Sequence, residues 1–236
     1  MISFYRMSIE WTIQGLSIPS STPTPPEEAI FFADHHHTRI KIDPSRGLIA
    51  CNGYPGHIQL YDIRNQVFAG SIEVVQYVRV SKTEKYTRIY APSVALFEFS
   101  KVVHGSSTNY YLATIDVRRG EDIGSEYSLK VFQFQSNSEK YNQVAQMDRP
   151  HGKYKVIGLT MQQQVIGCVT SAVDGSIKMW RTSSTNNVSP DTELQWICLY
   201  TLKYRDCPAN FTCFSHDNSL FALAHENMVS LWDPQR

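Results

Sequence analysis

Apolar and polar residues alternate with a period of two along nearly the whole 236-residue chain. This is the pattern of β-strands that bury one face. The alternating runs are about five to eight residues long, and clusters of Gly, Pro, Asn, Asp and Ser separate them. No stretch shows the three- and four-residue spacing of an amphipathic helix. The sequence therefore predicts an all-β fold made of many short strands.

From residue 39 onward the predicted strands fall into groups of four. The first group is 39–42, 48–52, 57–62 and 67–72, and the second is 93–99, 110–117, 128–134 and 141–146. The third is 156–161, 165–171, 176–181 and 194–203, and the fourth has only 210–214, 220–224 and 228–232. A recurring four-stranded unit is typical of β-propeller blades, which are stable only when neighbouring blades cover their faces.

A motif recurs on the third strand of each group, most clearly after the turn formed by Asp174 and Gly175. Glycine tolerates the positive φ that such a tight turn needs. Ile177 and Met179 then share one face of the strand, while Trp180 lies on the other. The last group ends with the dipeptide Trp-Asp at 232–233, and an aromatic residue stands at the same place in every group: Tyr61, Phe132, Trp180 and Trp232. This repetition predicts WD repeats in an incomplete propeller of about three full blades and one three-stranded blade.

Four residues of the third group, His151, Thr170, Asp174 and Trp180, occupy the positions of a hydrogen-bonded network that WD repeats share. A His–Asp pair beside a hydroxyl is also compatible with a hydrolase triad. The structural interpretation is favoured because the residues follow the repeat motif and no G-x-S-x-G turn is present. We therefore expect a non-catalytic protein in which the network stabilises one blade.

A segment between the first two groups mixes basic and aromatic residues: Tyr77, Arg79, Lys82, Lys85, Tyr86, Arg88 and Tyr90. Such a mixture suits phosphate contacts and base stacking, so it is a candidate loop for RNA or a protein partner. The alternative, a solvated connection between blades, remains open and is favoured. The formal net charge of zero gives the whole chain no general attraction to nucleic acid.

Metal, cofactor and membrane functions find little support in the sequence. Adjacent histidines at 35–37 cannot all face one ion from an extended strand, so a solvated loop is expected there. The five cysteines have no CxxC spacing and sit among β-type residues, which predicts small buried thiols and no disulfide framework. No run of 18 apolar residues exists, so we expect no membrane span. No glycine-rich phosphate loop and no paired-carboxylate constellation stands out, so we expect neither a cofactor nor a small-molecule substrate.

The chain divides into three parts at this level of description. Residues 1–16 alternate like a strand pair, 17–38 form a Pro-rich linker, and 39–236 form the partial propeller, with blades at about 39–75, 93–148, 151–203 and 209–236. Because three full blades and one three-stranded blade do not complete a ring, we expect the chain to be a fragment or a truncated form of a longer protein.

Longer stretches resemble one family of WD-repeat proteins. The element Asn52-Gly53-Tyr54-Pro55-Gly56-His57-Ile58-Gln59 is similar to the opening blade of the second propeller in the WD repeat-containing protein 75 family. Further similar stretches are 111–114, 129–132, 196–198, 209–215 and 217–224, in the same order. Residues 2–16 resemble the last two strands of that family's first propeller, whereas the Pro-rich linker departs from its pattern.

The resemblance implies a scaffold of the small-subunit processome in the nucleolus. Members of this family support pre-18S rRNA processing, ribosome biogenesis and RNA polymerase I transcription. Their implied partners are other processome subunits, with pre-rRNA and U3 small nucleolar RNA as further candidates. A generic WD-repeat adaptor, such as a substrate receptor of a ubiquitin ligase, is the alternative.

Overall fold

The computed structural model describes residues 39–76, 92–104, 106–120, 124–163, 165–182 and 195–234. These residues form β-strands and contain no helix, so the prediction of an all-β fold is confirmed. It follows that no helix in this part of the chain could cross a membrane. The predicted strand pair at 1–16, the linker at 17–38 with its three histidines and the segment Tyr77–Tyr90 lie outside the described residues.

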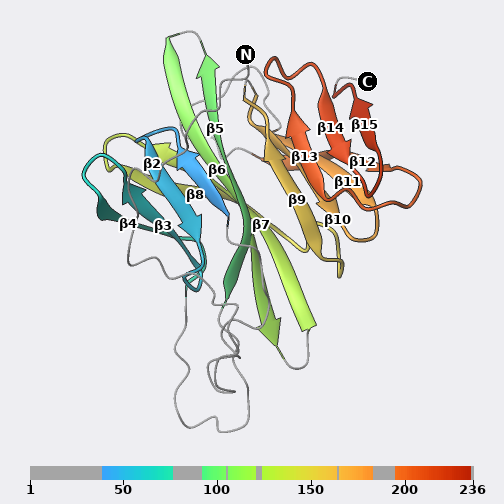
Figure 1. Ribbon diagram of the computed structural model, residues 1–236, viewed down its shortest axis with the longest axis horizontal. Coiled ribbons are helices and arrows are strands. Elements are labelled where there is room, and N and C mark those ends of the chain that lie inside the picture. Colours follow the sequence, from blue (N-terminus) through green and yellow to red (C-terminus); the bar gives the residue numbers. More distant parts are fainter. Residues whose placement is uncertain are drawn as a thin grey trace, which may run out of the picture.

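Four antiparallel sheets follow one another along the chain (Figure 1). The first holds β1 (Ile40–Asp43), β2 (Leu48–Asn52), β3 (His57–Asp62) and β4 (Val67–Glu73), and the second holds β5 (Ser93–His104), β6 (Ser107–Gly120), β7 (Gly124–Gln135) and β8 (Lys140–Asp148). The third holds β9 (Val156–Met161), β10 (Gly167–Ala172), β11 (Ser176–Thr182) and β12 (Trp196–Lys203), and the fourth holds β13 (Phe211–Phe214), β14 (Phe221–Ala224) and β15 (Val229–Trp232). Within each sheet the strands pair in sequence order, as in the blade of a propeller.

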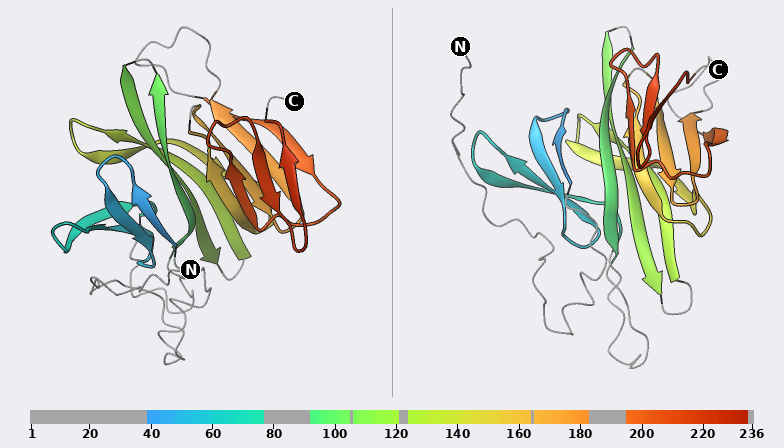
Figure 2. Two further views of the ribbon diagram at one scale, coloured as in Figure 1. Left: turned by 45° about the horizontal axis from the view of Figure 1, so that its top comes forward. Right: turned by 45° about the vertical axis from the view of Figure 1, so that its right-hand side comes forward.

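The strands of the second sheet are longer than the sequence indicated. The prediction ended its first strand at residue 99 and began the next at 110, yet β5 and β6 stay paired out to His104 and Ser107. The polar residues around Ser100 and Lys101 do not end the ladder, because antiparallel backbone pairing does not require an apolar side chain at every position. Figure 2 shows these long strands running past the neighbouring sheets.

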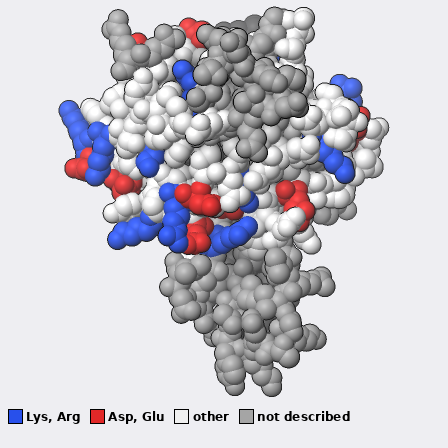
Figure 3. Space-filling model, turned by 180° about the vertical axis from the view of Figure 1, so that it is seen from behind, with Lys and Arg blue, Asp and Glu red and all other residues white. Residues whose placement is uncertain are grey.

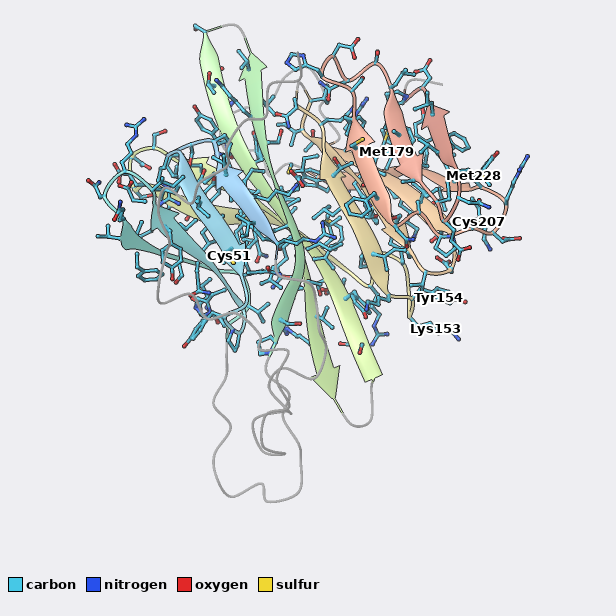
Figure 4. The ribbon with its side chains drawn as sticks, in the orientation of Figure 1. Cys51, Lys153, Tyr154, Met179, Cys207 and Met228 are labelled. Carbon is cyan, nitrogen blue, oxygen red and sulfur yellow. The ribbon has the colours of Figure 1, made fainter. Side chains whose placement is uncertain are left out.

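Three apolar clusters fill the spaces between neighbouring sheets. Between the first and second sheets, Ile58 and Leu60 meet Phe97. The second cluster joins the second and third sheets, and the last joins the third and fourth, where Met179 packs with Phe221. Figure 4 shows Met179 in the space between these two sheets. The core of this protein is therefore a series of interfaces between sheets.

Side chains on the third strand of a sheet point alternately toward the preceding sheet and the following sheet. Aliphatic residues three and one positions before the motif aromatic face the following sheet, as Leu129 and Val131 do in β7. The aromatic residue faces the preceding sheet, as Phe132 does. In the first three sheets a register shift lies directly before the aromatic, in the pairing of the third strand with the fourth. Such a bulge changes the direction in which the following side chain points.

A buried carboxylate ties the first two sheets together. Asp43, at the end of β1, is fully buried, and its Oδ1 accepts a hydrogen bond from the Tyr141 hydroxyl of β8 at 2.7 Å. Arg46 donates to Oδ2 from Nε at 3.1 Å and from Nη2 at 3.0 Å, and its guanidinium lies 5.9 Å from the centre of the Tyr141 ring. Burial and the neighbouring Asp43 charge raise the pKa of Tyr141, so the phenol stays protonated and donates.

Replacing Tyr141 with Phe is expected to lower the free energy of unfolding by about 2 kcal/mol, because the variant removes a donor from a buried carboxylate. Urea unfolding of both proteins measures the difference. Tyr110 provides a matched control, since its ring also packs on Phe134 and its hydroxyl has no hydrogen bond within the described residues. Equal losses in Tyr110→Phe and Tyr141→Phe would contradict a role for the Asp43 contact.

Candidate functional site

The third sheet brings the four predicted network residues into one hydrogen-bonded chain, with one addition. Trp180 Nε1 on β11 donates to Thr170 Oγ1 on β10 at 2.8 Å, and this hydroxyl lies 2.8 Å from His151 Nε2. His151 Nδ1 lies 2.7 Å from Ser176 Oγ, which donates to Asp174 Oδ1 at 2.7 Å. The chain of contacts therefore runs from Trp180 to Asp174 through two hydroxyls and one imidazole.

The Asp174 end of this chain and a neutral His151 together fix the direction of its hydrogen bonds. The Asp174 carboxylate can only accept, so Ser176 gives its one hydroxyl proton to Asp174 and accepts from Nδ1–H of His151. A neutral imidazole with its proton on Nδ1 accepts at Nε2, so the Thr170 hydroxyl, which itself accepts from the Trp180 indole, donates there. Burial, together with the nearby Lys178 charge, lowers the pKa of His151 to about 4. His151 is consequently neutral at physiological pH, with its proton on Nδ1.

The order of these groups differs from that of a hydrolase triad. In a triad the imidazole lies between a nucleophilic hydroxyl and a carboxylate. In this sheet Ser176 separates His151 from Asp174, and the Thr170 hydroxyl is fully buried and already accepts from Trp180. The geometry therefore suits a structural network that holds β10, β11 and the loop at His151 together.

Ser176 is the member of the network that the sequence reasoning did not name. Its backbone N–H also donates to Asp174 Oδ1, at 3.1 Å, which closes the turn around Gly175 at a φ of 79°. The turn motif contained the signal, because a Ser that follows Asp-Gly is placed to hydrogen-bond the Asp carboxylate. Although burial opposes it, the hydrogen bonds from Ser176 keep the pKa of Asp174 below its usual value.

The fourth sheet has a shorter chain of hydrogen bonds that runs in the same direction. Trp232 Nε1 donates to Ser230 Oγ at 2.8 Å, and that hydroxyl lies 3.1 Å from His225 Nε2. His225 Nδ1 lies 3.1 Å from the carbonyl oxygen of Cys207, which can only accept. The chain of the fourth sheet therefore ends on a backbone carbonyl, whereas that of the third sheet ends on the Asp174 carboxylate.

Lysines at equivalent positions connect the second and third sheets to the chain segments that precede them. Each lies two residues before the motif aromatic: Lys130 Nζ donates to the carbonyl of Val74, and Lys178 Nζ donates to the carbonyl of Pro150, both at 2.7 Å. Lys130 also lies 3.4 Å from Oδ1 of the fully buried Asp116. Burial raises the pKa of Asp116 to about 6 against the attraction of Lys130.

A polar cleft of about 400 Å³ opens at the junction of the first two sheets. Buried Lys130, Phe132 and Tyr141 lie along it beside the exposed Arg118 and Glu73. The amide side chains of Gln76, Asn142, Gln143 and Gln146 complete its lining. Its donors and acceptors are numerous and its charges have both signs, so it is suited to polar contacts with a partner.

Potential metal ligands, charged side chains and cysteines in the described part of the chain each bear on a prediction from the sequence. No group of three potential metal ligands occurs within the described ranges. On the face in Figure 3, basic side chains lie beside acidic ones. The predicted burial is confirmed for Cys51 and Cys168 but is wrong for Cys198 and Cys213, which are exposed. Cys198 lies on the outermost strand β12, and Cys213 lies on a sheet face that no described residue covers.

Comparison with known proteins places these sheets in a family. A model of the WD repeat-containing protein 75 second beta-propeller matches residues 40–236. WD repeat-containing protein 75 of Xenopus laevis is 24% identical over 204 residues, which cover 83% of this chain and 23% of that protein. The Homo sapiens protein is 24% identical over 200 residues with the same shares. The chain thus spans less than a quarter of the length of these relatives.

A solved propeller has the same fold. The β-propeller domain of Cps50 (Swd1) from Myceliophteria thermophila aligns with a TM-score of 0.51 at 11% identity. The alignment covers 89% of this chain and 58% of that one. The four sheets therefore form an open, incomplete part of a propeller.

Acidification from about pH 6.5 to about pH 4 is expected to remove the stability that neutral His151 contributes. An unfolded imidazole, with a pKa of 6.5, gains a proton in this range, whereas the folded one, with a pKa of about 4, does not. The unfolded state thus binds more protons, and the contribution, on the order of 3 kcal/mol, is complete above the unfolded pKa and is lost as the pH falls.

Asp116 has the opposite effect on stability over an overlapping pH range, because its folded pKa of about 6 lies above its ordinary 3.8. The difference between the wild type and His151→Gln therefore isolates the histidine. Urea unfolding across the range should show this difference shrinking as the pH falls, while exposed His216→Ala behaves like the wild type. A difference that does not change with pH would contradict the assigned protonation of His151.

Proposed function

Because this chain belongs to the WD repeat-containing protein 75 second β-propeller family, we propose that it is a non-catalytic scaffold of the small-subunit processome. In this role it supports pre-18S rRNA processing, ribosome biogenesis and RNA polymerase I transcription in the nucleolus. Its partners are other processome subunits, and pre-rRNA and U3 small nucleolar RNA are further partners of the same assembly.

The family match over residues 40–236 is the observation that carries this proposal. The propeller fold adds support, since WD-repeat propellers act in general through protein–protein contacts made by their exposed surfaces. The polar cluster around His151 is directed into the sheet and holds strands together. Its arrangement supports a role in which the domain presents surfaces and performs no chemistry.

Any contact with RNA is assigned to the basic and aromatic segment between the first two sheets. Tyr77–Tyr90 lies outside the described residues, so this assignment rests on its composition. The polar cleft lies close by in the chain, because Gln76 lines it and directly precedes Tyr77.

Depletion of the protein is expected to cause precursors of 18S rRNA to accumulate, because a missing scaffold blocks early assembly. Northern blotting of the precursors measures this effect, and the wild-type protein should reverse it. Affinity purification should recover processome subunits with pre-rRNA. Unchanged precursors, together with recovery of a ubiquitin-ligase adaptor, would overturn the proposal.

Replacing Arg79, Lys82, Lys85 and Arg88 with Gln should weaken binding of single-stranded pre-rRNA. If each side chain contacts one phosphate, the slope of log affinity against log salt should fall in magnitude by about 3, since single strands contribute about 0.7 per contact. Electrophoretic mobility shifts at several salt concentrations measure the slope. Gln at the exposed Lys101, Lys140, Lys153 and Lys155 is the matched control, and an equal effect there would refute a local RNA site.

A further inference from the structure

The loops at one end of the third sheet carry basic and apolar side chains together. Lys153 and Lys155 lie in the loop between β8 and β9, and Arg205 lies in the loop between β12 and β13. All three are exposed, and none forms an ion pair with a carboxylate of the described residues. Tyr154 and Val173, in the same loops and in the β10–β11 turn, are 42% and 44% exposed. We call these five residues the loop surface.

Backbone and ring contacts bring the first four members of the loop surface together. The Val173 N–H donates to the carbonyl oxygen of Lys155 at 3.0 Å, so the turn and the loop are joined. The Lys153 ammonium lies 5.8 Å from the centre of the Tyr154 ring. Figure 4 shows Lys153 and Tyr154 at the end of the third sheet. The exposed apolar groups therefore lie directly beside the unpaired ammonium groups.

The loop that carries Arg205 packs on the same turn. A Cβ atom at Gly175 would lie 3.1 Å from the carbonyl carbon of Asp206. Arg205 and Asp206 have φ values of 51° and 52°, which residues other than glycine adopt only where their surroundings hold them. Asp206 forms an ion pair with Lys203 at 2.8 Å, and the Arg205 guanidinium lies 5.2 Å from the centre of the Tyr204 ring. This loop thus has one defined conformation against the third sheet.

The hydrogen-bonded network described above fixes the loop surface from beneath. His151 belongs to the loop of Lys153, and Asp174 belongs to the turn of Val173. Both are tied to the strands through Ser176, so the loops are ordered before a partner binds and lose little conformational entropy in binding. The third sheet also has a neighbouring sheet on each side, so these loops do not belong to an uncovered sheet face.

We propose that the loop surface binds an extended acidic segment of a partner protein, an inference that rests on the scaffold role proposed above. Carboxylates of the segment pair with Lys153, Lys155 and Arg205, and an apolar side chain of the segment packs on Val173 and Tyr154. Three unpaired cations attract such a segment to a chain whose net charge is zero. An aliphatic side chain at Val173 favours a polypeptide over a nucleic acid, because it gains burial against an apolar residue and offers nothing to a phosphate.

Fluorescence anisotropy tests the contact, with the 236-residue chain and a labelled peptide of about 12 residues that repeats Asp-Glu-Leu. Replacing Lys153, Lys155 and Arg205 together with Gln should weaken binding about tenfold, the combined loss expected for three exposed ion pairs. Added salt should weaken binding to the wild type, because it screens exposed charges. Circular dichroism confirms that each variant is folded.

The matched control removes the same charges elsewhere. Arg64→Gln, Lys101→Gln and Lys140→Gln together change one arginine and two lysines that are exposed in other parts of the chain, so this variant should bind like the wild type. Val173→Ser separates the apolar contact from the charges. It should weaken binding of the Asp-Glu-Leu peptide and leave the weaker binding of an Asp-Glu-Ser peptide unchanged.

Equal losses in the loop variant and in the control variant would overturn the proposal. Oligouridylate that binds more tightly than the peptide, and is released by the loop variant, would identify a nucleic acid as the occupant and overturn it as well. A wild type that binds no peptide, while affinity purification still recovers processome subunits with pre-rRNA, would refute this contact and leave the scaffold role standing.

Discussion

Coverage of each sheet by its neighbours is the constraint on which this structure depends. A single four-stranded sheet has two faces and no interior, and the three apolar clusters formed by the described residues all lie between sheets. The third strand makes this possible because its aliphatic side chains pack on the following sheet and its aromatic side chain packs on the preceding sheet. Stability is therefore shared between neighbours, as in repeat proteins whose units fold only when stacked.

Polar groups give these interfaces a defined geometry. Apolar contact between two sheets tolerates small shifts, whereas a buried donor must meet its acceptor within a few tenths of an ångström. The Tyr141 hydroxyl on Asp43 fixes the second sheet against the first, and Lys130 fixes it against the carbonyl of Val74. Lys178 has the same function one sheet later. Such contacts hold the first three sheets at fixed angles to one another, as a surface that binds partners requires.

The repeat could be predicted from the sequence because its signals are local. The Asp174-Gly175 turn, the alternation around Trp180 and the aromatic at each third strand are all visible within a few residues. Contacts between distant segments could not be predicted in this way. The meeting of Asp43 with Tyr141 and of Lys130 with Val74 depends on the angle between sheets, which no short stretch of sequence encodes.

The cysteines show the same limit of prediction from local sequence. Cys213 lies in an alternating run like that of Cys168, and the sequence assigned both to the interior. Their strands are equally β-like, but only Cys168 belongs to a face that another described sheet covers. Whether an inward-type position is buried depends on the presence of a neighbour. Local pattern identifies the face of a strand, and assembly determines whether that face meets solvent.

The positions of the two lysines imply an order in which the row of sheets comes apart. If the first sheet separates from the second, the Lys130 ammonium loses its acceptor at Val74. If the second separates from the third, Lys178 loses its acceptor at Pro150. The fourth sheet has Ser230 at this position, and the described residues give it three short strands. We therefore expect the backbone amides of β13–β15 to exchange with solvent sooner than those in the long ladders of the second sheet.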